Sequence, residues 1–139
     1  MKTLKKERLE GVHEQTVPFH DCDPLGIVWH GHYLKYFEIA RERLFDRIGL
    51  TLPYFRDHGL HLVVIESRIR HAFPLRTGEL LRARCWFKET EQRILLGGEV
   101  TNLTHDRRAA RAWITLVSMR GEEMLLETPH EILRLVPGP

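Results

Sequence analysis

The chain has 139 residues, 42% of them hydrophobic, and a formal net charge of +2 at pH 7. This length suits one domain, residues 1–139, that buries its own core. The small net charge gives no argument for nucleic-acid binding. No apolar run reaches the ~20 residues of a membrane-spanning helix, and residues 1–11 lack the apolar core of a signal peptide. We expect a cytoplasmic protein whose residues 1–10 form a flexible basic tail.

The first regular element is expected to be a strand over Val12–His20, because apolar residues alternate there and Asp21 continues the alternation. A tight turn should follow, since Pro24 fixes its own φ angle and Gly26 permits a positive one. The stretch is dense in chemically active side chains, with two acids, a cysteine and three histidines between residues 19 and 33. A functional loop is therefore expected between this strand and the next element.

A long helix is predicted over about 30–48, because apolar residues recur there at spacings of three and four. Gly49 is a suitable residue to end it. A second, short helix is predicted over Pro53–His58, stopping at Gly59. The apolar stripe of the long helix is broad, which favours packing against a sheet.

From residue 60 onward the pattern is that of strands. The predicted strands cover the following ranges: His61–Phe73, Leu81–Lys88, Arg93–Leu103 and Ala109–Met119. Cys85 lies on the apolar side of its strand and is expected to be buried and unreactive. The pair Gly97-Gly98 within a strand predicts a bulge or a close backbone approach. The segment Pro129–Val136 closes the chain without a clear pattern.

One strand, one long helix and then four antiparallel strands predict an α+β domain, with the helix across one face of a curled sheet. Periodicity does not determine the order of the strands in that sheet. The two cysteines, Cys22 and Cys85, are far apart in sequence and do not suggest a disulfide framework.

The segment Asp21–Trp29, which reads Asp-Cys-Asp-Pro-x-Gly-Ile-Val-Trp and is followed by Tyr33, resembles a family motif. It is similar to the motif of the 4-hydroxybenzoyl-CoA thioesterase branch of the hot-dog fold acyl-CoA thioesterases. The resemblance implies a hot-dog fold, a curled antiparallel sheet of about five strands wrapped around one long helix. It also implies hydrolysis of an acyl-CoA thioester to a free acid and coenzyme A.

Asp23 matches the catalytic carboxylate of that motif, where it would act as nucleophile or as general base. The backbone amide of His30 matches the main donor that polarises the thioester carbonyl. From the residues alone, Asp23 is more simply an acid that caps the turn before Pro-x-Gly. Asp21 is expected to make structural hydrogen bonds at a strand end.

Six further residues are predicted to contact the substrate: Gly26, Trp29, Gly31, Tyr33, Glu38 and Arg93. From the pattern alone, Glu38 is an exposed helix charge; the resemblance makes it a reserve catalytic acid or a contact to the acyl group. Arg93 would contact the phosphates of coenzyme A. The aryl-specific relatives have a denser basic run near it, where this chain has Glu91-Gln92-Arg93.

A metal site is not expected, because His30 and His32 are two residues apart at a helix start and would point to different faces. The acids and Cys22 match no common zinc spacing. No cofactor is expected beyond the coenzyme A of the substrate itself. Two alternatives remain open: a non-catalytic module that binds acyl thioesters, and a hot-dog dehydratase or hydratase. The His/Asp pairing of the dehydratases is not reproduced in this motif.

In the resembled fold, the strand after the helix would lie at the sheet edge and pair with the same strand of a second subunit. Its apolar run Leu62–Ile65 would be a liability if left unpaired. The resemblance therefore implies at least a homodimer, and a homotetramer as in relatives.

Overall fold

The computed structural model describes residues 8–137. Of the expected basic tail, residues 1–7 lie outside the described part of the chain. The strands, in chain order, are β1 (Gly11–Thr16), β2 (Leu60–His71), β3 (Leu80–Glu89), β4 (Ile94–Asn102), β5 (Arg107–Arg120) and β6 (Glu123–Met124). The α-helices are α1 (Tyr33–Arg47), α2 (Leu52–His58) and α3 (His130–Leu133). The prediction of an α+β domain is confirmed.

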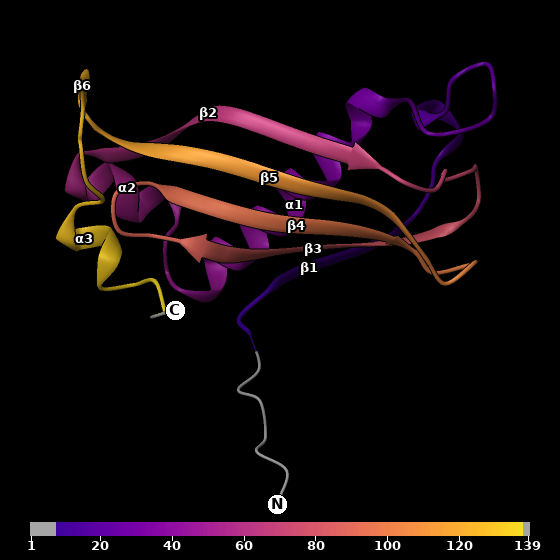
Figure 1. The fold of residues 1–139 in the computed structure, drawn as a ribbon. Helices are drawn as coiled ribbons and strands as arrows, with labels where there is room; N and C mark the ends of the chain where they lie inside the picture. Colours follow the sequence, from indigo (N-terminus) through magenta and orange to yellow (C-terminus); the bar gives the residue numbers. More distant parts are fainter. Residues whose placement is uncertain (1–7, 138–139) are drawn as a thin grey trace, which may run out of the picture.

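The strands form one curled antiparallel sheet in the order β1-β3-β4-β5-β2, with the short β6 paired to β5 (Figure 1). Five strands on this path agree with the expected number, and β6 adds a sixth among residues 8–137. Helix α1 lies behind the sheet and packs against β1, β3 and β4. Strand β2 is at the edge of the sheet, as expected.

Helix α1 buries one broad stripe against the sheet. Tyr36, Phe37, Ala40 and Leu44 are all 0% exposed, and together they cover the inner sides of the strands. The predicted close backbone approach is confirmed at Gly98, where a Cβ would lie 2.7 Å from the ring of Phe37. The sheet irregularities lie elsewhere in β3 and β4, between Phe87 and Glu89 and between Val100 and Thr101. Gly98 therefore allows α1 to pack closely against β4.

The predicted first strand was too long. Strand β1 ends at Thr16, and residues 19–21 form a 3₁₀ turn that follows Pro18. Phe19 is 82% exposed, so the apparent alternation through Asp21 does not reflect a strand. A proline has no amide hydrogen to donate to a sheet ladder, which explains why pairing stops before it. The placement of Asp21 at a strand end was wrong.

The predicted helices are close to the observed ones. Residues 30–32 form a 3₁₀ turn before α1 begins, and Gly49 follows the end of α1 with φ of +79°. Gly59 ends α2 in the left-handed conformation. The unassigned closing segment contains α3. No helix among residues 8–137 is long and apolar enough to cross a membrane.

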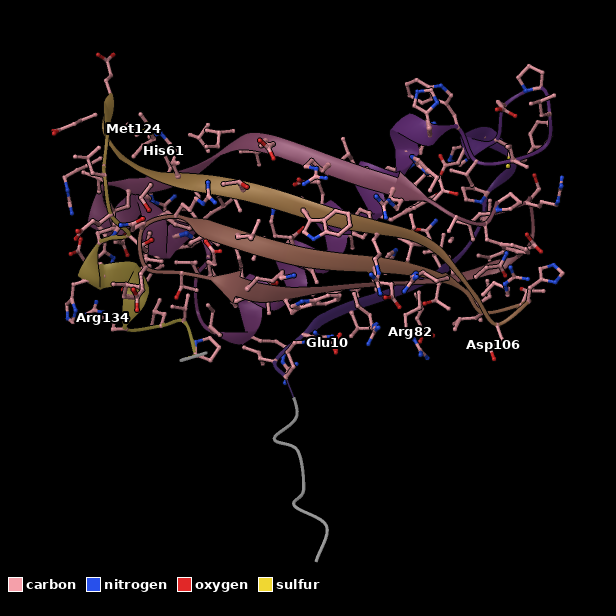
Figure 2. The ribbon with its side chains drawn as sticks, viewed as in Figure 1. Glu10, His61, Arg82, Asp106, Met124 and Arg134 are labelled. Atoms are coloured by element: carbon pink, nitrogen blue, oxygen red, sulfur yellow. The ribbon has the colours of Figure 1, made fainter. Side chains whose placement is uncertain are left out.

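The two ends of the sheet carry different loops (Figure 2). Asp106, in the β4–β5 hairpin, lies at the end where Thr16 pairs with Leu80. The loop before α1 begins at this end, and the segment after β2 contacts it. Met124 and Arg134 lie at the opposite end, with α2 and α3.

Candidate functional site

The loop between β1 and α1, residues 17–32, is called the motif loop below. Its tip is a tight turn in which the amide of Asp23 donates to the carbonyl of Ile27 at 2.8 Å. The amide of Gly26 donates back to the carbonyl of Asp23 at 2.9 Å, with Gly26 at φ of +80°. Few residues other than glycine adopt this conformation without strain. The turn that Pro24 and Gly26 predict is therefore confirmed.

Asp23 is half-buried at this tip. Its Oδ1 accepts a hydrogen bond from the amide of Leu25 at 2.9 Å, which is the turn-capping role that the sequence allowed. Its other oxygen, Oδ2, has no hydrogen-bond donor among residues 8–137. One oxygen thus fixes the carboxylate in place while the other is available to a water molecule or a substrate.

The segment between β2 and β3, residues 72–79, supports the motif loop. The amide of Val28 donates to the carbonyl of Leu75 at 2.8 Å, and Ile27 forms a bridge with Arg76. The hydroxyl of Thr77 donates to Sγ of Cys22 at 3.1 Å. Leu75 itself is fully buried. The loop tip therefore rests on a packed support.

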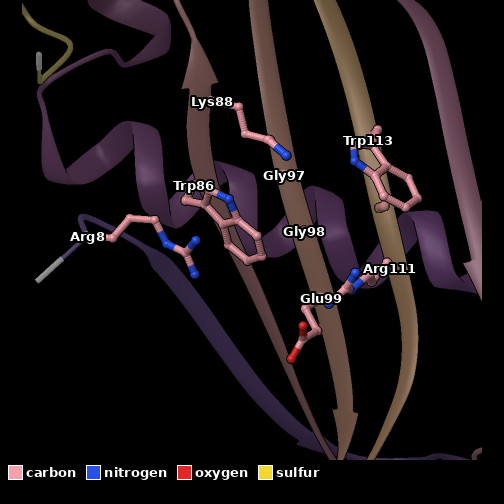
Figure 3. Close-up of a pocket in the computed structure, with 9 residues that line it drawn as sticks. Arg8, Trp86, Lys88, Gly97, Gly98, Glu99, Arg111 and Trp113 are labelled. Carbon is pink, nitrogen blue, oxygen red and sulfur yellow. The ribbon is translucent and has the colours of Figure 1, made fainter. Parts of the chain in front are cut away.

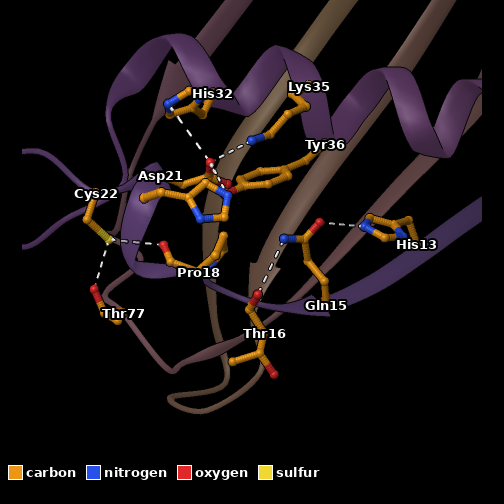
Figure 4. A network of polar contacts seen from close by, with 11 residues as sticks. His13, Gln15, Thr16, Pro18, Asp21, Cys22, His32, Lys35, Tyr36 and Thr77 are labelled. Carbon is orange, nitrogen blue, oxygen red and sulfur yellow. Dashed lines mark hydrogen bonds and ion pairs between the residues drawn. The ribbon is translucent and has the colours of Figure 1, made fainter.

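Asp21 is the most tightly held acid of the motif loop (Figure 4). It is 1% exposed; its Oδ1 accepts from Nζ of Lys35 at 2.6 Å, and its Oδ2 accepts from the hydroxyl of Tyr36 at 2.7 Å. Burial acts to raise the pKa of Asp21, but the two hydrogen bonds and the charge of Lys35 outweigh it and leave the pKa below its ordinary value. The expected structural role of Asp21 agrees with this environment.

Asp21 also joins the loop to the beginning of the helix. Its backbone carbonyl accepts a hydrogen bond from the amide of Trp29 at 3.0 Å. The side chains of His20 and His32 lie 3.8 and 4.0 Å from its Oδ1. Through its carboxylate and its carbonyl, Asp21 thus holds the start of α1 against the base of the loop.

The 3₁₀ turn before α1 leaves two backbone amides free. The amides of His30 and Gly31 have no hydrogen-bond acceptor within the described range. The first amides of a helix carry partial positive charge and can bind an oxyanion. The indole of Trp29, 48% exposed, lies over Gly31, where a Cβ would be only 2.1 Å from the ring. Glycine is required there for the indole to cover the helix start.

Tyr33 fills the core instead of facing solvent. It is 4% exposed, and its ring packs edge-on against that of His71 at a centroid distance of 4.7 Å. Burial raises the pKa of Tyr33 to about 12. Burial, followed by the charge of His30, lowers the pKa of His71. The end of β2 thus borders the same region as the helix start.

Two predicted contact residues lie away from the motif loop. Glu38 is exposed on α1 and pairs with Arg41. Arg93 is exposed in the turn between β3 and β4, where its Nε lies 3.7 Å from a carboxylate oxygen of Glu89. Strand β3 separates this turn from the motif loop by about 30 Å, at ~3.3 Å per residue. The structure does not bring Arg93 and Asp23 together within one protomer.

Sequence reasoning missed Lys35 and Tyr36 as partners of Asp21. A buried carboxylate must find donors, but the burial of Asp21 was hidden by its apparent place at the end of a strand. The supporting segment around Leu75 was also missed, because nothing local in the sequence indicates that it underlies the loop. Within residues 8–137, no group of three or more His, Cys, Asp or Glu side chains is arranged to hold a metal ion.

A scan against family models matches residues 17–135 to the model described as the thioesterase-like superfamily. Among curated proteins, the 1,4-dihydroxy-2-naphthoyl-CoA hydrolase of Thermosynechococcus vestitus is 32% identical over 71 residues, which is 50% of this chain and 49% of that protein. The chain spans about half the length of the first curated relatives that it matches.

Solved structures resemble the whole fold. A hypothetical protein from Thermus thermophilus, TT1821, has a TM-score of 0.81 at 25% identity, with 91% of this chain and 96% of that one covered. A mutant of 4-hydroxybenzoyl-CoA thioesterase, complexed with 4-hydroxybenzoyl-CoA, has a TM-score of 0.80 at 21% identity, with 93% and 99% covered. This second likeness concerns the fold alone, and it confirms the expected hot-dog arrangement.

Proposed function

Since the chain belongs to the thioesterase-like superfamily, we propose that it hydrolyses an acyl-CoA thioester to the free acid and coenzyme A. One observation carries the proposal. A carboxylate with a free oxygen, Asp23, and two backbone amides without acceptors, those of His30 and Gly31, belong to the same anchored loop. These are the two kinds of group that acyl transfer from a thioester requires.

In the proposed reaction, the amide of His30 donates to the thioester carbonyl oxygen and stabilises the negative charge that develops on it. Asp23 either attacks the carbonyl carbon or removes a proton from the attacking water. The tetrahedral intermediate then expels the thiolate of coenzyme A, which takes up a proton. If water is the nucleophile, this step gives the free acid. If Asp23 is the nucleophile, it leaves an anhydride between Asp23 and the acyl group, which a water molecule then hydrolyses to the free acid and the Asp23 carboxylate. Because a thiolate is a good leaving group, we propose that the reaction needs no metal ion or cofactor.

The remaining contacts follow from the shape of the loop. At Gly26 the backbone is open to a substrate, since nothing lies within 4 Å of a Cβ there, and Gly31 makes room for the indole of Trp29, whose exposed face would contact the acyl group. Tyr33, buried against His71, would support the helix start from the core. The two free cysteines, Cys22 and Cys85, suit the reducing cytoplasm in which we propose that the enzyme acts.

Glu38 and Arg93 lie away from the motif loop and have less direct roles in the proposal. Glu38 is the reserve acid, and it would also bear on acyl specificity. Because Arg93 is about 30 Å from the motif loop along β3, its contact with the phosphates of coenzyme A would have to be made to a substrate bound in another subunit.

We propose that two copies pair through β2. This strand is bonded to β5 on one side only, and its side chains Val63, Val64 and Ile65 are 38%, 39% and 56% exposed. Pairing with the same strand of a second copy would satisfy the free backbone groups and cover these side chains. Further association to a tetramer would cover more surface. A dimer would also place the end of β2, next to His71, at the boundary between subunits.

Light scattering at micromolar concentration tests the assembly. Val64→Lys should shift the protein toward monomers, because a charge would be buried at the pairing edge. Leu52→Lys is the matched control: Leu52 is 82% exposed on α2 and outside β2, so this variant should keep the wild-type mass. A stable and active wild-type monomer would reject the proposal.

A panel of acyl-CoAs assayed by release of the free thiol tests the reaction itself. We expect measurable hydrolysis of at least one aromatic or short-chain member, and loss of that activity in Asp23→Asn. If every aromatic, short-chain and long-chain member stays intact but one binds, the chain is a binding module. If none is hydrolysed and none binds, the proposed function is wrong.

A further inference from the structure

The face of the sheet opposite to α1 carries a groove floored by glycine. In the strand register, Gly97 of β4 lies between Trp86 of β3 and Trp113 of β5. Their side chains lie on the face that α1 does not cover, since neighbouring residues such as Gly98 pack against the helix. The Cα atoms of the two tryptophans are about 10 Å apart, two strand spacings. Because Gly97 has no side chain, it leaves a gap between them that the indole of Trp86 fills only in part.

This gap, called the outer groove below, is a cavity of about 370 Å³ (Figure 3). Its size lies within the ~300–1,000 Å³ of small-molecule sites. The indole of Trp86 leans over Gly97, where a Cβ would lie 2.5 Å from Nε1. The guanidinium of Arg8 stacks on the same indole, 3.7 Å from the ring centroid, and comes from the side of β1. The cavity continues from Trp86 across the glycine to Trp113.

Positive charge lies along the strands on both sides of the two indoles. Lys88 follows Trp86 by two residues and Arg111 precedes Trp113 by two, so the two cations line opposite ends of the groove. Neither forms an ion pair with another residue in the described range. The one carboxylate in the lining, Glu99, lies 3.0 Å from Arg84 and 3.9 Å from Arg108. The outer groove is therefore positive as a whole.

We propose that the outer groove binds a planar aromatic anion, a flat ring that carries a phosphate or carboxylate group. A flat ring would stack on the indole of Trp113, because the indole of Trp86 already contacts Arg8 and Gly97. The cations at the ends of the groove would pair with the anionic group. A purely apolar ligand would leave Lys88 and Arg111 without partners, and a small inorganic anion would not use the stacking surface of Trp113. This site is separate from the motif loop and does not depend on the proposed hydrolysis.

Calorimetric titration of the wild-type protein can test the site with two probes, adenosine 3′,5′-bisphosphate and benzoate. We expect at least one of them to bind with Kd below about 1 mM. Preference for the bisphosphate would indicate a nucleotide, and preference for benzoate an aromatic acid. Inorganic phosphate and uncharged adenosine, which each lack half of the recognised chemistry, should bind at least ~10-fold more weakly.

Two variants decide whether binding occurs in the outer groove. Arg111→Gln should weaken binding of the preferred probe by ~10-fold, since it removes a charged hydrogen-bond donor. Trp113→Ala should weaken it by at least ~5-fold, through loss of stacking. Arg56→Gln is the matched control: it makes the same charge change at an exposed residue of α2, outside the groove lining. It should leave Kd within about twofold, as expected for a screened surface charge.

Several results would overturn the proposal. Neither probe binding below about 1 mM would do so, as would equal binding of inorganic phosphate. Unchanged affinity in Arg111→Gln would mean that the probe binds elsewhere, and this variant alone decides the test if Trp113→Ala does not fold. A lower assembly mass for Arg111→Gln in light scattering would show that this face is an interface between copies of the chain instead.

Discussion

Asp21 and Asp23 are two residues apart in one loop, yet they occupy opposite kinds of environment. Asp21 is 1% exposed, and both of its oxygens accept hydrogen bonds from α1. Asp23 is half-buried at the tip, where only one oxygen is bonded, and the donor is the amide of Leu25 in the same turn. The base of the motif loop is thus fixed to the helix, while its tip keeps an acceptor free.

This difference separates two tasks that a reactive carboxylate would otherwise have to perform alone. Any group that must act on a substrate cannot also have all its lone pairs used by the fold. The carbonyl of Asp21 accepts from the amide of Trp29, and its carboxylate accepts from Lys35 and Tyr36, so Asp21 fixes the start of α1. Asp23 is then held only by its own turn. Each acid can be tested by a substitution that keeps its size.

The largest effect is expected for Asp23→Asn. The amide oxygen can still accept the bond from Leu25, so the turn should survive, but the charge and the basicity are lost. We expect kcat to fall by ~10²–10⁴, the range for loss of a general base. Thiol-release kinetics measure the fall, and a thermal melt that matches the wild type checks the fold. A kcat near that of the wild type would remove Asp23 from the proposed mechanism and make Glu38 the candidate.

Asp21→Asn should act mainly on stability. Tyr36 can still donate to the amide oxygen, and the half-exposed Lys35 can return to water. We therefore expect a loss of about 1–3 kcal/mol in the free energy of unfolding, the value of hydrogen bonds to a charged group. The value of kcat should stay within about tenfold of the wild type. Denaturant unfolding and kinetics on the same preparation test both. Equal losses of kcat in the two Asn variants would mean that the loop is only structurally sensitive.

The contrast between these two acids was only partly visible in the sequence. The turn at Asp23 is local, since Pro24 and Gly26 determine it within four residues, and the sequence predicted it. The surroundings of Asp21 are not local, because Lys35 and Tyr36 come 14 and 15 residues later in the chain. The alternation of Val17, Phe19 and Asp21 also imitates a strand that in the structure has already ended at Thr16.

The same limit applies to the fold. Helix α1 and the strands β3 to β5 follow from periodicity, because each is amphipathic along its own length. The pairing of β1 with β3, and the position of β2 at the far edge, depend on contacts between distant segments. The outer groove is a further case. It exists because three strands bring Trp86, Gly97 and Trp113 into one row, which no single strand shows.

The decline of the free energy of unfolding at acidic pH, called the acid limb below, should distinguish the contribution of Asp21 from that of nearby groups. Its pKa is lower in the folded chain than its ordinary value of 3.8, so its contribution to stability is complete above that value and is lost as the pH falls through the folded pKa. His71, with a pKa lowered from 6.5, should cause an earlier decline as the pH falls below 6.5. Urea unfolding between pH 7 and 3 measures both.

In Asp21→Asn, the decline below about pH 4 should be smaller than in the wild type, whereas the decline below pH 6.5 should remain. The side chains that face Asp21 include those of His20, His32 and Lys35, and Lys35 is its closest cationic partner. An unchanged acid limb in the variant would mean that the ion pair with Lys35 contributes little to folding.

The smallest effect is expected at the third acid, Glu38. It is exposed on α1 and pairs with Arg41 one helical turn later. An exposed pair of this kind contributes about 0–1 kcal/mol, so Glu38→Gln should leave the free energy of unfolding nearly unchanged. If Asp23 carries the chemistry, kcat should also stay within about threefold, whereas KM for aromatic substrates reports any contact to the acyl group. Glu42→Gln, also exposed on α1, is the matched control. A fall in kcat of ~10² or more in Glu38→Gln, with Glu42→Gln unaffected, would transfer the role of base from the tip of the motif loop to the helix.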